Sequence, residues 1–325
     1  MHHGKEIYLF FGKYQIYGIY GIIISSALMG IIIYKVLLIT RKNEIENYEQ
    51  FIDHLNINKK VKDIIKIIIQ TFLLISFYVM IAGFSAYFSQ ELQIPSYIGT
   101  TIIVILCYII FMGNIERLMK VNEILVPILI TTIVLLIFQN KEAFSIIEKH
   151  TTSQSITQAM WDAILYTSYN SIVLIPILLP LSKKLKQKSN IATVSSLCAI
   201  ILTILAISIF GLLLKINIDI NQIELPTVYV ASMMGKGYKI IYGIIILVSI
   251  YTSAISAGYG FLEKYQKNPK QYKKIAILIC MMAFLVANIG FTTLVNILYP
   301  ICGMLGLIQI ILIIKKGWKK KQKLI

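Results

Sequence analysis

Residues 16–39 read IYGIYGIIISSALMGIIIYKVLLI, an apolar run of about 24 residues in which Lys35 carries the only charge. A helix needs about 20 mostly apolar residues to cross a bilayer, so this run is long enough to span one. The whole chain of 325 residues is 57% hydrophobic and 14% charged, whereas soluble domains contain about 25% charged residues. We therefore expect an all-α, multi-span membrane protein.

The same pattern recurs along the chain and predicts about nine membrane-spanning helices in one integral membrane domain, residues 1–325. The expected spans are about 16–39, 64–88, 97–113, 122–138, 160–181, 190–214, 238–261, 274–289 and 291–314. Residues 287–290 join the last two spans and predict a tight helical hairpin. A half helix at 4–12 is too short to cross, so it is either buried among the other helices or lies in the membrane interface.

The distribution of basic residues predicts the orientation of the chain. With the 41–62 loop in the cytoplasm, 24 of the 31 Lys and Arg residues lie on that side or at its helix ends, and seven lie on the other. Such an asymmetry is typical of the positive-inside rule. We expect a cytoplasmic C-terminus and an N-terminus outside. Because these charges lie between apolar runs, the formal charge of +16 indicates orientation in a membrane and no nucleic-acid partner.

A polar stretch interrupts the span at 160–181. Residues 166–171 read Tyr-Thr-Ser-Tyr-Asn-Ser, and Pro176 and Pro180 follow. Asn and Ser are weak helix formers, and Pro removes a backbone donor. Two interpretations remain open. Either a turn unwinds near the middle of the membrane and exposes backbone groups to a small polar ligand, or the helix is kinked and its polar face packs on its neighbours.

A second polar stripe lies in the span at 238–261. Ser249, Ser253, Ser256 and Gly260 recur at spacings of four and three and therefore share one helix face. Small residues at this spacing favour close helix packing in membranes. The alternative is a cation site, since the hydroxyls of Thr252, Ser253 and Ser256 offer oxygen ligands to an ion such as Na⁺.

Ionisable residues are few within the apolar runs, and Glu6 is the one of most interest. If the half helix is buried, Glu6 and the backbone at Gly4 face the interior, where a charge is expensive and usually functional. The four cysteines (Cys107, Cys198, Cys280 and Cys302) lie singly in apolar runs and are expected to be packing residues. No clustered acids, histidines or nucleophile–base pairs lie in the spans. We therefore expect neither an enzyme, nor a metal site, nor a resident cofactor.

Several stretches, in order along the chain, resemble the YkvI-like family of bacterial membrane proteins, distant relatives of the amino acid–polyamine–organocation transporters with the LeuT fold. They are Gly4-Lys5-Glu6-Ile7, Phe10-Phe11-Gly12, residues 121–127, Leu165-Tyr166-Thr167-Ser168-Tyr169-Asn170, Glu224-Leu225-Pro226 with Ala231-Ser232, Ile241-Tyr242-Gly243, Tyr251-Thr252-Ser253-Ala254, and Leu298-Tyr299-Pro300 with Gly303 and Gly306.

The resemblance implies a LeuT-like inverted repeat of five plus five helices, with the first helix of each half broken around a central site. Met1 then falls inside the first break. The chain either starts downstream of the true beginning or is an inactive remnant. The resemblance also implies that the 215–237 segment is an outer lid, although a plain connecting loop is equally compatible with its sequence.

The function expected on these grounds is a secondary transporter-like protein of the bacterial cell membrane. It would carry a small polar solute such as an amino acid, by alternating access and with Na⁺ or H⁺ as coupling ion. A ligand-sensing or scaffold membrane protein of the same fold is the alternative. Its predicted partners are the lipid bilayer and the solute. The predicted substrate-binding residues are Gly4, Glu6, Tyr166, Ser168, Tyr169 and Asn170, and the possible cation ligands are Thr252, Ser253 and Ser256.

Overall fold

The structure is a computed structural model, which describes residues 4–45, 48–55, 58–113, 126–135, 155–182, 188–214, 216 and 220–319. Within these residues the chain is helical, with short connections and no β-strand. The helices are α1 (Lys5–Phe11), α2 (Ile16–Lys42), α3 (Tyr48–His54), α4 (Lys59–Glu91), α5 (Ser96–Phe111), α7 (Ile156–Leu181), α8 (Lys188–Leu213), α9 (Pro226–Met233), α10 (Lys236–Leu262), α11 (Pro269–Ala287) and α12 (Phe291–Lys319), with a further helix at Val126–Leu135. Short 3₁₀ helices lie at η1 (Gly12–Tyr14), η5 (Ile220–Gln222) and η6 (Glu263–Tyr265).

Every predicted span contains a helix in the part of the chain that is described. Five of these helices, α2, α4, α8, α10 and α12, are long and apolar enough to cross a membrane. The helices α5 and Val126–Leu135 are apolar but shorter, and residues 122–125 and 136–138 of the fourth predicted span lie outside the described residues. The predicted hairpin is present, because α11 ends at Ala287 and α12 begins at Phe291. Gly290 has a φ of 91°, which glycine adopts readily.

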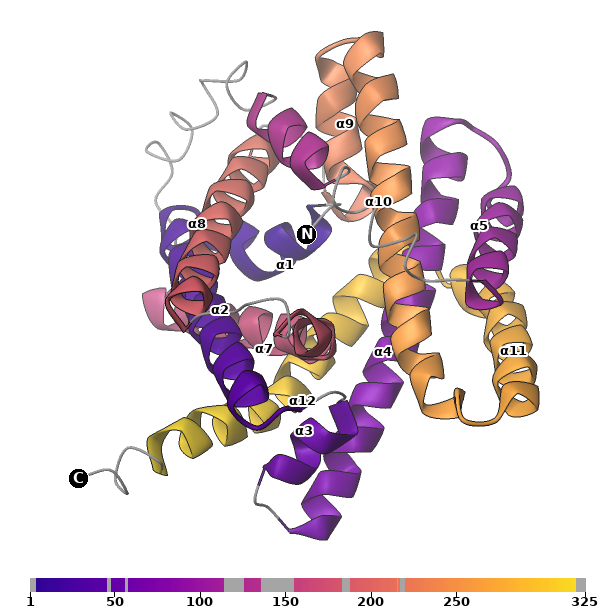
Figure 1. Cartoon of the computed structure of the whole chain (residues 1–325). Helices are drawn as coiled ribbons and strands as arrows, with labels where there is room; N and C mark the ends of the chain where they lie inside the picture. Colours follow the sequence, from indigo (N-terminus) through magenta and orange to yellow (C-terminus); the bar gives the residue numbers. More distant parts are fainter. Residues whose placement is uncertain are drawn as a thin grey trace.

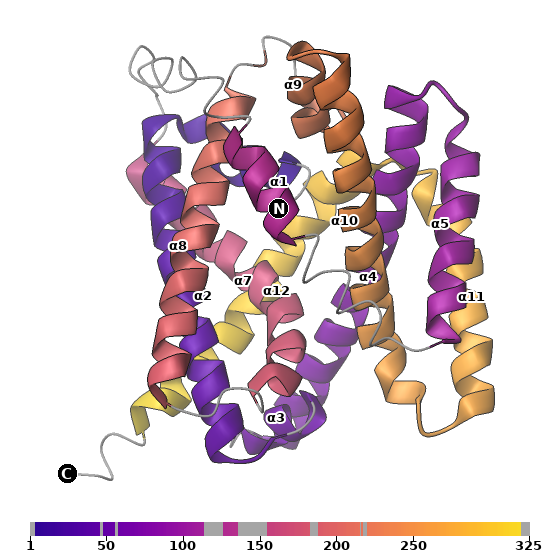
Figure 2. The same ribbon diagram turned by 45° about the horizontal axis from the view of Figure 1, so that its top comes forward.

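The helices form two groups that lie side by side (Figures 1 and 2). In one group α2 packs against α7 and α8, and α1 contacts all three. In the other group α4 packs against α10 and α5, and α11 packs against α4 and α5. The long helix α12 contacts α7 and α2 on one side and α4 on the other, so it joins the two groups.

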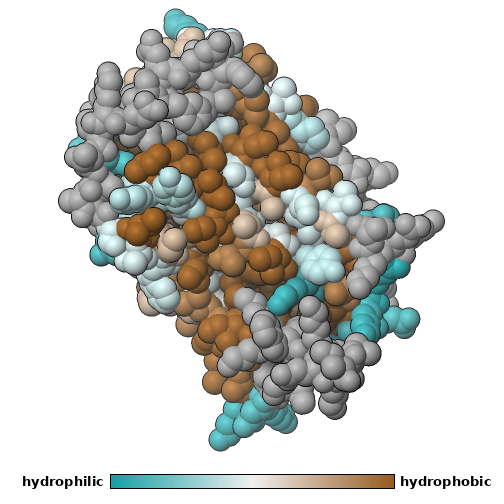
Figure 3. Space-filling model, turned by 90° about the vertical axis from the view of Figure 1, so that its left-hand side faces the viewer, coloured by the Kyte–Doolittle hydropathy of each residue, from teal (hydrophilic) through white to brown (hydrophobic). Residues whose placement is uncertain are grey.

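The surface around these groups is strongly hydrophobic. Brown residues predominate on the face shown in Figure 3, and hydrophilic residues gather mostly toward its ends. Many large apolar side chains are exposed, among them Ile67, Ile109, Ile200, Met281 and Leu285. Apolar patches of this extent are rare on soluble monomers. Their exposure is favourable in lipid, so the composition and the surface agree on a multi-pass membrane protein.

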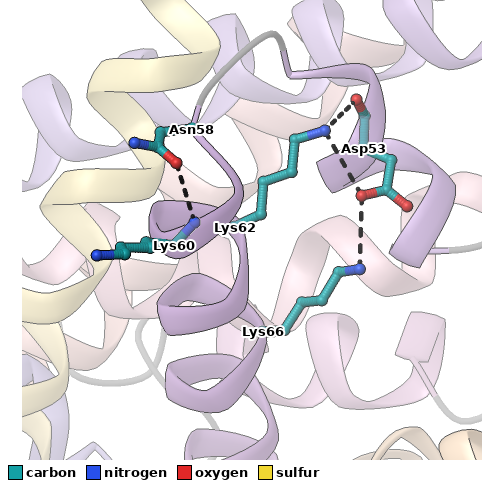
Figure 4. Close-up of polar contacts among 5 residues, drawn as sticks. All are labelled: Asp53, Asn58, Lys60, Lys62 and Lys66. Carbon is teal, nitrogen blue, oxygen red and sulfur yellow. Dashed lines mark hydrogen bonds and ion pairs between the residues drawn. The ribbon is translucent and has the colours of Figure 1, made fainter.

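Basic connections gather at one end of the molecule. In Figure 2 the α2–α4 connection, the α10–α11 connection and the C-terminus all lie toward the same, lower end. Polar contacts fix the first of these connections (Figure 4). Lys62 Nζ donates to the Asp53 backbone oxygen at 2.7 Å, and Lys62 and Lys66 both pair with the Asp53 carboxylate. Asn58 caps α4 by accepting from the Lys60 amide at 3.2 Å.

Candidate functional site around Glu6

The short helix α1 lies in the interior of the molecule, inside a ring formed by longer helices (Figure 1). Of the two placements left open by the sequence, burial among the other helices is therefore the one observed. Gly4 precedes the helix with a φ of 73°, and a Cβ atom at this position would lie 2.8 Å from Thr227 Cγ2 of α9. Close packing and backbone conformation thus both require glycine at this residue.

Burial of α1 places a carboxyl group in the interior. Glu6 is only 3% exposed, and it lies near enough to the hydroxyls of Tyr166, Tyr169 and Tyr299 to interact with them electrostatically. A carboxylate at this depth is expensive to bury and is usually functional. The predicted site residues Glu6, Tyr166 and Tyr169 are therefore brought together, with Tyr299 of α12 as a further member.

Aromatic rings pack together beside α1, and three of them belong to the tyrosines that interact with Glu6. We call Phe10, Phe11, Phe72, Tyr166, Tyr169 and Tyr299 the aromatic cluster. Tyr169 is at its centre, stacked on Phe10 with ring centroids 5.5 Å apart and on Tyr299 at 4.8 Å. It also meets Tyr166 edge-on at 5.4 Å and Phe72 at 6.4 Å. The rings come from α1, α4, α7 and α12, so the cluster lies where the two helix groups meet.

The unwound turn predicted at residues 166–171 is not present, because α7 is a continuous helix from Ile156 to Leu181. Its polar side chains satisfy their hydrogen bonds on the helix itself. Thr167 Oγ1 donates to the Ala163 carbonyl at 2.8 Å, and Asn170 Nδ2 donates to the Tyr166 carbonyl at 2.8 Å. Such bonds allow Ser, Thr and Asn to sit inside an apolar helix without exposing the backbone. Of the two interpretations, the unwound turn is excluded, and the polar side chains lie on a continuous helix.

Ser168 and Asn170, two further predicted site residues, lie on the same helix, and the Asn170 side chain also interacts with the hydroxyl of Tyr169 in the aromatic cluster. The Ser168 hydroxyl donates to the Ile164 carbonyl at 2.7 Å. At Gly306 of α12, a Cβ atom would lie 2.5 Å from the Ser168 backbone oxygen, so the two helices touch at this point. Ser168 therefore marks a close helix crossing, while the tyrosines on either side of it supply the hydroxyls near Glu6.

The possible cation ligands on α10 lie apart from α1. That helix packs chiefly against α4, α9 and α5, whereas α1 packs chiefly against α7, α2, α8 and α12. The Thr252 hydroxyl donates to the Ser249 carbonyl at 3.0 Å, and Ser256 donates to the Thr252 carbonyl at 2.8 Å; Ser253 is half-buried. These oxygens are hydrogen-bonded within their own helix and are not assembled with Glu6.

Lys5 is a residue near the site that was not among the predicted site residues. This lysine is buried, and its ammonium group donates to the carbonyls of Ile220 and Ile223, the second at 2.7 Å. Its partners lie more than 200 positions away in the sequence, so no local pattern indicates them. Only its place beside Glu6, in the Gly4-Lys5-Glu6 stretch, pointed to this part of the chain.

The η5–α9 segment (residues 220–233) that holds Lys5 also binds both helix groups. Gln90 of α4 accepts from the backbone amides of Glu224 and Leu225 at 3.0 and 3.3 Å. The Glu224 carboxylate accepts from the amide and the hydroxyl of Thr292 in α12, both at 2.7 Å. The segment closes the end of the molecule opposite to the basic connections (Figure 2).

Among the described residues, no group of three or more His, Cys, Asp or Glu side chains is placed to hold a metal ion. The thiols of Cys107, Cys198, Cys280 and Cys302 are free, and all but Cys198 are fully buried. The chemistry available at the Glu6 site is therefore that of a carboxyl group, phenol hydroxyls and aromatic faces. These groups bind small polar molecules, and ammonium groups in particular.

The chain is similar to two bacterial proteins, one of which is described as a membrane protein. No protein-family model matches the chain. It is 25% identical over 309 residues to "Uncharacterized membrane protein YkvI" of Bacillus subtilis (strain 168), a match that covers 94% of this chain and 88% of that protein. It is 26% identical over 313 residues to "Uncharacterized protein YyaD" of the same organism, with the same coverage of both chains. These matches, which span nearly the whole chain, confirm its resemblance to the YkvI-like family.

Proposed function

We propose that this protein is a secondary transporter that carries a small polar solute across the bacterial cell membrane by alternating access. The observation that carries this proposal is the Glu6 carboxyl group, buried in the interior beside three tyrosine hydroxyls where two groups of helices meet. Secondary transporters bind their solutes near the middle of the bilayer, at the junction of two helix assemblies that move relative to each other.

The arrangement of helices supports a LeuT-like architecture. In that architecture the first helices of the two repeats lie together around the site, and α1 contacts α7 in this way. The remaining helices then divide into a moving bundle and a scaffold. The group of α1, α2, α7 and α8 and the group of α4, α5, α10 and α11 fit these two parts (Figure 2).

The chemistry of the site favours a solute with an amino group. The carboxyl group of Glu6 attracts a cation, and the phenol oxygens of Tyr166, Tyr169 and Tyr299, which interact electrostatically with Glu6, can accept hydrogen bonds from its N–H groups. The buried hydroxyl of Tyr166 makes no hydrogen bond of acceptable geometry with the described residues, so it is available to a ligand. An amino acid is the solute class that we propose.

The solute reaches Glu6 only when helices move, because the carboxyl group and the rings of Tyr166, Tyr169 and Tyr299 are all buried. On the outer side this movement must displace the η5–α9 segment, which Lys5, Gln90 and Thr292 hold in place. The distribution of Lys and Arg supports a cytoplasmic C-terminus, which puts this segment on the outside. Na⁺ or H⁺ is the proposed coupling ion.

Uptake into proteoliposomes tests the proposal. A panel of radiolabelled amino acids is offered under an inward Na⁺ or H⁺ gradient, and the solute with the highest uptake is then used with the variant Glu6→Gln. We expect this neutral, isosteric change to reduce uptake about tenfold or more, because it removes a charge-assisted hydrogen bond at a buried site.

The matched control is Glu91→Gln. Glu91 is another largely buried carboxylate, but it pairs with Lys239 at 3.0 Å and lies outside the aromatic cluster. This variant should keep most of the uptake. No uptake of any panel member by the wild-type protein, with binding still measurable, would contradict transport and favour the ligand-sensing alternative. Full uptake by Glu6→Gln would show that the solute binds elsewhere in the protein.

A further inference from the structure

A pocket lies away from Glu6, at the start of α7. It is open, has a volume of about 290 Å³, and is lined by Lys13, Tyr14, Thr157, Gln158, Trp161 and Asp162. None of these residues belongs to the aromatic cluster. The volume is at the lower end of the range for small-molecule sites, so the pocket suits a compact polar group.

Both signs of charge meet in this pocket. Lys13 Nζ lies 3.0 Å from the Asp162 carboxylate, and the Tyr14 hydroxyl donates to the same oxygen at 2.8 Å. Asp162 is 17% exposed and Lys13 is 53% exposed, so a ligand from outside reaches the lysine end of this ion pair more easily. A ligand with one charge would be attracted by one of these groups and repelled by the other. A ligand that carries both an anion and a cation would satisfy both.

Lys13 is charged at every physiological pH. Burial by itself lowers the pKa of Lys13, but the Asp162 carboxylate and the Tyr14 hydroxyl more than offset this effect, so the pKa lies above its ordinary value of 10.5. The ammonium group also lies 4.9 Å from the centre of the Tyr14 ring. An anionic group that enters the pocket therefore finds a permanent cation.

The pocket is at the level of the membrane interface. Lys13 and Tyr14 come directly before Ile16, where the apolar span of α2 begins. Trp161 is 52% exposed, and Ile16, Tyr20, Ile156 and Met160 are exposed as well. The beginning of α7 lies at the periphery of the molecule (Figures 1 and 2). An exposed Trp beside an apolar span is typical of the level of lipid headgroups.

We propose that this pocket binds the headgroup of a zwitterionic aminophospholipid from the outer leaflet. The phosphate binds Lys13, and the ammonium group binds Asp162 against the ring of Trp161. A free zwitterion would use the same charges but would gain nothing from the apolar residues beside the pocket. The headgroup of an anionic phospholipid has no ammonium group that could pair with Asp162.

Trp161 provides a direct test, since the chain has only two tryptophans and the other is Trp318. In the Trp318→Phe protein, Trp161 fluorescence is measured in phosphatidylcholine vesicles that contain equal small fractions of brominated phosphatidylethanolamine or brominated phosphatidylglycerol. Phosphatidylcholine is a suitable background because its quaternary ammonium cannot donate a hydrogen bond to Asp162. We expect phosphatidylethanolamine to quench Trp161 with about tenfold higher apparent affinity than phosphatidylglycerol.

The variants Asp162→Asn and Lys13→Gln should each remove most of this preference, the first through the ammonium group and the second through the phosphate. Glu91→Gln, which breaks the separate pair with Lys239, should keep it. If Asp162→Asn fails to fold, Lys13→Gln still decides, since its side chain is half-exposed. Equal quenching by the two lipids, or an unchanged preference in Lys13→Gln, would overturn the proposal.

Soluble phosphoethanolamine distinguishes the source of the ligand. Titrated into the detergent-solubilised Trp318→Phe protein, it should change Trp161 emission weakly and only at high concentration. Tight binding of this free compound, with no difference between the two brominated lipids, would assign the pocket to a soluble zwitterion and contradict the lipid proposal. None of these measurements depends on transport, so they remain decisive whether or not the proposed function holds.

Discussion

Two polar stretches within apolar helices, residues 166–171 of α7 and residues 249–256 of α10, look alike in sequence but have different surroundings. In both, the short hydroxyls donate to carbonyls of their own helix, as Ser168 and Ser256 do. In α7, however, two tyrosines project toward Glu6 and Tyr299. Ser and Thr in such helices form hydrogen bonds with carbonyls of their own helix. The longer polar side chains, here the tyrosines of α7, therefore indicate the site.

The largest expected effect comes from removing the central tyrosine of α7. Tyr169→Leu deletes a ring that stacks on Phe10 and Tyr299 and a hydroxyl beside Glu6. We expect uptake to fall about a hundredfold, because both the stacked ring at the centre of the cluster and a hydroxyl that can bind the solute are lost. The matched change in α10, Thr252→Val, should reduce uptake by less than about threefold. Equal losses in the two variants would show that the stretches do not differ in function.

The next largest effect is expected at α1. This helix distinguishes the two stretches, since it lies against α7 and not along α10. Lys5→Met keeps the length of the side chain but removes its bonds to the carbonyls of Ile220 and Ile223. We expect a loss of about 2 kcal/mol in the free energy of unfolding, since two buried acceptors lose a charged donor. Thermal unfolding in detergent measures this loss. Lys66→Met, at the exposed pair with Asp53, is the control and should cost less than about 1 kcal/mol.

Glycines at helix crossings provide the next comparison, with an expected loss of stability that is similar or slightly smaller. A Cβ atom at Gly306 would lie 2.5 Å from the backbone oxygen of Ser168, which cannot move aside, so Gly306→Ala should cost about 1–3 kcal/mol. At Gly260 of α10 the nearest atom is the flexible Leu73 Cδ1 at 3.3 Å. We therefore expect Gly260→Ala to change the thermal midpoint little. A larger shift for Gly260→Ala than for Gly306→Ala would contradict the packing described.

The smallest effect is expected at the hydroxyls themselves. Ser168→Ala and Ser256→Ala each remove a bond to the same helix, at 2.7 and 2.8 Å, and leave the carbonyl with its backbone donor. Both variants should lose less than about 1 kcal/mol of stability and keep nearly full uptake. A severe uptake defect in Ser256→Ala alone would support the hypothesis of a cation site on α10.

The sequence predicts the helices well because membrane helices follow directly from apolar run length. The hairpin at residues 287–290 follows from an equally local feature, a glycine, whereas the half-length apolar segment leaves open whether Glu6 is buried or lies in the membrane interface. The sequence leaves open whether α7 is unwound at residues 166–171. The helix is continuous there, with Asn170 and Thr167 bonded to their own helix, and sequence alone does not show whether such side chains unwind a turn or stabilise it.

The parts of the site that escaped prediction depend on long-range contacts. Lys5 meets carbonyls of η5, and Tyr299 meets Tyr169, across more than a hundred positions in each case. Thr252, Ser253 and Ser256 have residue types that suit a cation, but α10 packs chiefly on α4 rather than on α1. No spacing along the chain encodes which helices become neighbours.

Hydrogen–deuterium exchange of the reconstituted protein, with and without the amino acid that shows the highest uptake, tests the central claim most directly. If the solute binds beside Glu6, it should change exchange in the two neighbouring segments, α1 (Lys5–Phe11) and residues 166–171 of α7. Exchange in residues 249–256 of α10 should stay unchanged. A change confined to residues 249–256, with α1 and α7 unaffected, would contradict it.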